Sequence, residues 1–172
     1  RDIMKPEQKP KGDFIAQGEE QIQAIYESVP EKDRATVERV VQAGGKLMFS
    51  EQTHKYMLEI VDADGDMAGK LGVGIVQLMM LLHQQTKGKI PLNAWTPAAS
   101  ILLVNAMEFV EKTDGGMDME LYGQALKIMI LSLTKKVKEI TGQTDKQAEP
   151  AQPAAQPSQP VGGLMSAPAQ GV

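Results

Sequence analysis

The sequence predicts an all-α fold, a bundle of five to six short helices with an extended N-terminal arm and a disordered or strap-like C-terminal tail. Apolar residues recur at helical spacing almost everywhere between residues 13 and 142, and no alternating strand pattern of useful length appears. The composition changes at both ends of this region. We therefore expect a basic arm at 1–12, a helical bundle at 13–142, and a Pro/Ala/Gln/Gly-rich low-complexity tail at 143–172.

The two ends differ in charge. The arm holds four basic and two acidic residues and two prolines, which favours an extended chain. From residue 147 onward the tail contains five of the ten prolines and hardly any charge. Such a segment has too few apolar residues to offset the entropy of ordering, so on its own it is expected to be a solvated tail. The alternative is a strap that orders on a partner through Val161, Leu164 and Met165.

The first two helices are predicted from caps and apolar spacing. Asp13 is expected to cap a helix whose apolar face carries Ile15, Ile22, Ile25 and Tyr26. Ser28 and Glu31 have the spacing of a capping box, with Pro30 tolerated in the first turn of a second helix. Gly44-Gly45 should weaken or end that helix, because glycine is a poor helix former.

The third and fourth helices flank a turn. Ser50 is expected to cap a third helix with His54, Met57, Leu58 and Val61 on one stripe. The Asp/Gly-rich run at 62–66 suits a turn better than a helix interior. A fourth helix is predicted to start near Asp66 and to reach about Gln85.

Turn and cap residues also bound the last two helices. Thr96-Pro97 is expected to open a fifth helix, because proline at the first helical position loses no hydrogen bond, and Gly115-Gly116 to close it. Asp118 should cap a sixth helix, which Gly142 ends. The apolar stripe of that sixth helix is predicted to be Tyr122, Leu126, Met129, Leu133, Val137 and Ile140.

The fourth and fifth helices are more apolar than a solvated helix needs to be. Residues 71–82 are apolar on nearly every face, but they would rise only about 18 Å, less than the roughly 30 Å of a bilayer core. Glycine inside a helix costs roughly 1 kcal/mol, which suggests close approach of another backbone, with the fifth helix as a candidate neighbour. Either these helices form the centre of the bundle, or they contact other copies or a membrane. The candidate contact residues are Gly69, Gly72, Gly74, Met79, Met80, Leu102 and Val104.

The sequence offers no recognisable apparatus for catalysis, cofactor binding or metal binding. No cysteine is present, the net charge is −4, and neither a P-loop nor a serine-triad motif appears. The aspartates at 62, 64 and 66 mimic part of a calcium loop, but the later ligand positions do not fit. Glu51 and His54 have di-iron spacing without the second copy that such a site needs. We expect no catalytic, cofactor-binding or metal-binding residues, no enzyme activity and no sequence-specific nucleic-acid binding.

Three stretches carry a resemblance to a known class of proteins. The runs GGKLMFSEQTHKYMLEIV, GKLGVGIVQLMMLLHQQ and PAASILLVNAMEFVEKTDG resemble small helical virion proteins of tailed bacteriophages, over about residues 44–142. The resemblance implies a non-enzymatic structural component of the virion, internal or associated with DNA ejection, that oligomerises into a ring or tube. Its partners would be further copies of itself, the portal, tail or larger ejection proteins, and transiently a host membrane.

A second function remains open from the residues alone. Methionine repacks easily, and eleven methionines would suit a soluble helical adaptor or regulator that binds a partner helix in a Met-rich groove. Met79, Met80, Met107 and Met129 are more simply core residues, whereas Met117 and Met119 are candidate contact points.

Overall fold

The computed structural model describes residues 13–50, 59, 62 and 64–142. In these residues the chain is helical and contains no strand, so the all-α class is confirmed. The helices are α1 (Asp13–Ser28), α2 (Glu31–Phe49), α4 (Met67–Gln85), α5 (Leu92–Thr113) and α6 (Met119–Thr141).

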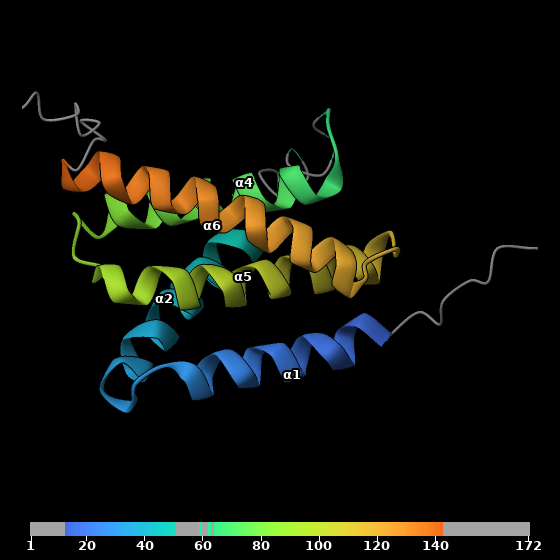
Figure 1. Ribbon diagram of the computed structural model, residues 1–172, viewed down its shortest axis with the longest axis horizontal. Coiled ribbons are helices and arrows are strands. Elements are labelled where there is room, and N and C mark those ends of the chain that lie inside the picture. The colour runs from blue at the N-terminus through green and yellow to red at the C-terminus, as the bar shows by residue number, and fades with distance from the viewer. Residues whose placement is uncertain (1–12, 51–58, 60–61, 63, 143–172) are drawn as a thin grey trace, which may run out of the picture.

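The helix α5 is the centre of the bundle and packs against all four other helices. Figure 1 shows α1 on one side of α5 and the pair α4 and α6 on the other. The helices α4 and α6 run side by side in the same direction. The helix α5, which follows α4 and precedes α6 in the sequence, runs in the opposite direction. At the start of α5, Trp95 is completely buried, and its Nε1 donates a hydrogen bond to the Ile90 carbonyl over 3.3 Å. The core is therefore organised around one long apolar helix.

Several predicted helix ends are confirmed. Asp66 is the N-cap of α4 and its carboxylate accepts a hydrogen bond from the Gly69 amide at 2.8 Å. Asp118 caps α6 in the same way, through the Leu121 amide at 2.8 Å. Gly142 ends α6 with a φ of 71°, in the left-handed region that glycine adopts without strain. These helix ends depend on the capping residues themselves, so they can be predicted from the sequence.

The predicted capping box at the start of α2 is wrong, and so is an end of α2 at Gly44-Gly45, one of the two effects expected of that pair. Ser28 is the last residue of α1, where its hydroxyl donates to the Ile25 carbonyl at 2.7 Å, and Pro30 is the N-cap of α2 without a side-chain cap. The Gly44-Gly45 pair does not end α2, which continues to Phe49. The physical reason is packing, because a Cβ on Gly44 would lie only 2.6 Å from a methyl of Leu102 in α5. Glycine at this position lets the two helices approach closely.

The predicted start of α5 is also wrong. The helix begins at Leu92, after Pro91 as N-cap, and Pro97 lies inside it. Proline there lacks the amide that would bond four residues back, so the second turn of α5 loses one backbone hydrogen bond. Burial of Ala94 and Trp95, both 0% exposed, offsets that loss and extends the helix by one turn.

The stripe predicted for α6 is correct at its centre and wrong at its end. Tyr122, Met129 and Leu133 are buried, but Ile140, in the last turn of α6, is 38% exposed. The predicted helix after Ser50, with His54, Met57, Leu58 and Val61, lies outside the described residues. The arm at 1–12 and the tail at 143–172, including Val161, Leu164 and Met165, also lie outside them.

Candidate interaction surface

Five of the seven predicted contact residues lie inside the bundle. Gly72 and Gly74 are buried in α4, and Met79, Leu102 and Val104 are 0% exposed. The helices that cover them belong to the same chain. Their apolar character is therefore explained without a second copy or a membrane.

Gly72 shows why α4 contains glycine. A Cβ on Gly72 would lie 2.7 Å from the carbonyl oxygen of Ala125 and 3.1 Å from the amide nitrogen of Met129. The expected close approach of another backbone is confirmed, but the neighbour is α6 and not α5. The sequence contains no signal that distinguishes these two neighbours, because both helices are apolar on their inner faces.

The other two predicted contact residues lie nearer the surface. Gly69 is half-buried, and a Cβ there would lie 2.9 Å from the Asp66 carboxylate that caps α4. Its role is to leave room for the cap. Met80 is half-buried and packs against the edge of the core, so it is the one predicted contact side chain that reaches the surface.

Sequence reasoning missed the apolar side chains that the fold leaves exposed. On the outer side of the α4 and α6 pair, Val73 is 42% and Leu131 is 65% exposed. Val73 adjoins Gly72, which contacts Ile128 of α6, and Leu131 follows Ile128 by about one helical turn. Residues 71–86 contain no Asp, Glu, Lys or Arg, so Lys70 in the first turn is the one Lys, Arg, Asp or Glu residue within α4. The other exposed large apolar side chains are Phe49, Leu81, Leu92, Ile130 and Ile140.

The charges of α1 and α6 are opposite. The helix α1 contains four carboxylates and neither lysine nor arginine. The helix α6 contains four lysines and two glutamates. Figure 1 places these helices on opposite sides of α5, so the described bundle has an acidic face and a basic face. The charged residues of each helix can be counted from the sequence, but the position of the two helices on opposite sides of α5 cannot be predicted from it.

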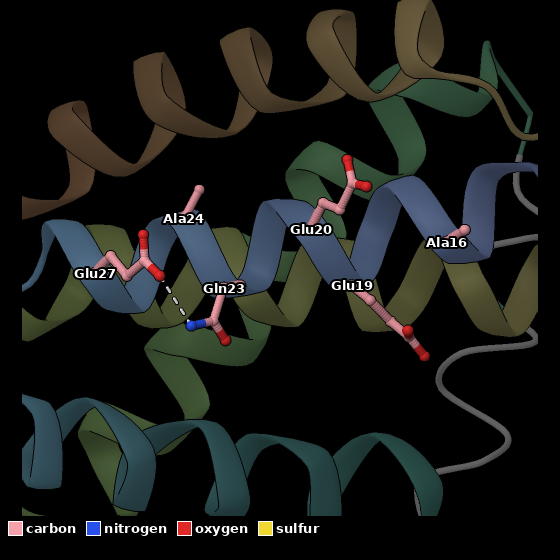
Figure 2. A pocket seen from close by; sticks show the side chains of 6 residues that line it. All are labelled: Ala16, Glu19, Glu20, Gln23, Ala24 and Glu27. Atoms are coloured by element: carbon pink, nitrogen blue, oxygen red, sulfur yellow. Dashed lines mark hydrogen bonds between the residues drawn. The ribbon is translucent and has the colours of Figure 1, made fainter.

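The outer face of α1 forms a shallow, open pocket. Figure 2 shows α1 in front of α5, with the pocket-lining side chains extending from α1 and not back toward α5. Within it, the Gln23 amide donates a hydrogen bond to the Glu27 carboxylate at 2.9 Å. The lining residues are Ala16, Glu19, Glu20, Gln23, Ala24 and Glu27. Two alanines among three carboxylates make a surface that is low in relief and acidic.

A second, smaller pocket of about 220 Å³ lies where α2 and α5 end. Its lining residues are Phe49, Asn105, Glu108, Phe109 and Lys112. One carboxylate oxygen of Glu108 is buried without a hydrogen-bond partner among the described residues, beside Gly18 of α1. Burial raises the pKa of Glu108, Glu19 raises this pKa further, and Lys112 lowers it. The group is a carboxylate with one oxygen lacking a hydrogen bond in the α1–α5 contact, and no nucleophile or second acid among the residues that line this pocket gives it a catalytic partner.

The metal-like patterns of the sequence form no metal site in the part of the chain that the structure describes. No group of three or more His, Cys, Asp or Glu side chains is gathered there in a position to hold a metal ion. Asp66, the third aspartate of the calcium-like run, is used as a helix cap. Glu51 and His54 lie outside the described residues.

The eight methionines within the described ranges form no exposed groove. Met48, Met79, Met107 and Met129 are 0% exposed, in agreement with core packing for three of the four residues proposed for it. Met67, Met80, Met117 and Met119 are half-buried and pack against the core. The described residues thus give no observation in favour of a Met-rich groove.

Comparisons of the chain with protein families, with curated proteins and with solved structures find no match. None of the described helices combines the length and the hydropathy that a membrane-spanning segment requires.

Proposed function

We propose that the protein is a non-enzymatic structural component that works by self-association. The observation that carries this proposal is the outer surface of α4 and α6. It combines the exposed side chains of Val73 and Leu131 with a helix that has no charged residue over 71–86. Exposed apolar side chains such as these are stabilised by burial against another protein surface.

The resemblance to small helical proteins of tailed-phage virions supports a virion as the place where this self-association occurs. In that setting the protein would be an internal or DNA-ejection-associated virion component, and its copies would form a ring or tube. The portal, tail or larger ejection proteins would be its neighbours. A small all-α bundle built around one central helix provides a rigid unit for such packing.

The test is the mass of the full chain in solution. Light scattering coupled to size-exclusion chromatography should give a multiple of the single-chain mass, with a share that rises with concentration. Replacing Leu131 by serine should reduce that share, whereas replacing Lys32 on α2 by serine should not. A single-chain mass over the whole concentration range would refute self-association.

Two further measurements examine the virion setting. Mass spectrometry of purified phage particles that carry the chain should find many copies per particle. If transient contact with a host membrane belongs to this function, the chain should release dye from anionic vesicles. Vesicles that stay intact at neutral and acidic pH would remove membrane contact and leave the assembly role in place.

A further inference from the structure

We propose that copies of the protein join head to tail, with the basic face of α6 of one copy seated on the acidic face of α1 of the next. This inference rests on the proposed self-association and specifies its interface. It follows from the charges, the relief and the positions of the two faces.

Charge complementarity selects these two faces. The outer face of α1 presents Glu19, Glu20 and Glu27, all exposed, and the helix has no cation that neutralises them. On α6, Lys127 and Lys135 are exposed, each four residues from Leu131. Opposite charges on two surfaces attract each other during encounter and fix which surfaces meet.

The relief of the two faces also fits. Among the residues that the structure describes, Leu131 is the most exposed large apolar side chain, and it lies between Lys127 and Lys135 along α6. On α1, the small exposed side chain of Ala24 lies between Glu20 and Glu27, in the shallow pocket of Figure 2. At about 1.5 Å per residue, the two lysines are about 12 Å apart along α6 and the two glutamates about 10 Å apart along α1. Leu131 can therefore rest on Ala24 while both lysines reach carboxylates.

The positions of the faces decide the symmetry. Because α1 and α6 lie on opposite sides of α5 (Figure 1), one two-fold interface cannot contain both helices. A two-fold dimer formed through either face would pair α1 with α1 or α6 with α6, and both arrangements bring like charges together. The complementary faces lie on opposite sides of α5 (Figure 1), so each copy keeps one free face after the first contact. Repetition of one heterologous contact closes a ring or continues as a filament.

Two charge-reversed variants of the full chain test this interface. The first carries Lys127→Glu and Lys135→Glu, and the second carries Glu20→Lys and Glu27→Lys. Each variant alone should associate at least about tenfold more weakly than the wild type, because every copy then meets a face of its own sign. All four positions are exposed, so the fold should persist, which circular dichroism verifies.

An equimolar mixture of the two variants provides the decisive measurement. Every contact between unlike copies in that mixture pairs opposite charges, so association should return to the wild-type level. The matched controls are Lys32→Glu and Glu38→Lys on the exposed surface of α2, which should leave association unchanged. Added salt should weaken the wild-type assembly, because it screens exposed charges.

The outcomes separate the interface from the function. Wild-type chains that associate, together with variants that associate equally well or a mixture that stays dissociated, would overturn the head-to-tail contact and leave self-association standing. Wild-type chains that never associate would overturn both. Variants that fail alone and recover when mixed would establish the contact.

Discussion

Replacing Gly72 by alanine should destabilise the protein, although alanine is the better helix former. The added Cβ would lie 2.7 Å from the Ala125 carbonyl oxygen and 3.1 Å from the Met129 amide nitrogen, both backbone atoms of α6. Ordinary contacts begin at 3.4 Å, so α4 and α6 must separate by several tenths of an ångström along their shared length. Overpacking of this kind costs about 1–3 kcal/mol, and the gain in helix propensity returns up to about 1 kcal/mol. With the full gain subtracted, the net loss should be about 0–2 kcal/mol.

Gly123 supplies the matched control on the partner helix. It is exposed on α6 and a Cβ there would meet no atom within 4 Å. Gly123→Ala should therefore stabilise the protein by about 0.5–1 kcal/mol through helix propensity alone. Guanidinium unfolding followed by far-UV circular dichroism, at a protein concentration too low for association, gives both values. A Gly72→Ala chain that gains as much stability as Gly123→Ala would refute the account of the α4–α6 contact.

Three further changes probe other parts of the bundle. Trp95→Ala should cost about 3–5 kcal/mol, because it empties a fully buried site and leaves the Ile90 carbonyl without its donor; a loss below 1 kcal/mol in denaturant titration would contradict this. Asp118→Ala should cost about 1 kcal/mol by removing the N-cap of α6, whereas Asp114→Ala, at an exposed position, should be nearly neutral in thermal melts. The pKa of Glu108 is raised in the folded protein. The contribution of Glu108 to the free energy of unfolding is therefore fully present below the pKa that this residue has in the unfolded chain, and it is lost as pH rises through the pKa in the folded protein. Glu108→Gln should therefore gain stability relative to the wild type as pH rises through that range, and unfolding curves in which this gain is larger at acidic pH would count against the assignment.

Local chemistry could be predicted from the sequence better than contacts between helices. Asp66, Asp118 and Gly142 act within one turn of their own position, and each was identified from its residue type and spacing. The errors at Gly44 and Pro97 have a different origin. Both residues disfavour a helix locally, and both lie within helices because burial against a distant segment outweighs the local cost.

The candidate surface shows the same division. The apolar residues of α4 and α5 were recognised, but which helix covers them depends on the path of the chain, which the sequence does not state. Leu102 and Val104, which were candidate contact residues, are therefore buried in the core. Leu131, which lies between two lysines along α6, is exposed instead. The opposite charges of α1 and α6 could be read from the residues, whereas their positions on opposite sides of α5 needed the structure.

The way α1 is attached affects how the bundle opens. It rests mainly on α5, and it contributes Phe14 and Gly18 as buried residues and Ile22, Ile25 and Tyr26 as partly buried ones, fewer buried residues than α4 or α5, so separating it from the bundle should cost less free energy than separating either of those helices. Its amide hydrogens should consequently exchange with deuterium earlier than those of α5. Recruitment of α1 by a neighbouring copy would slow that exchange, so the least anchored helix would report on whether the copies have come together.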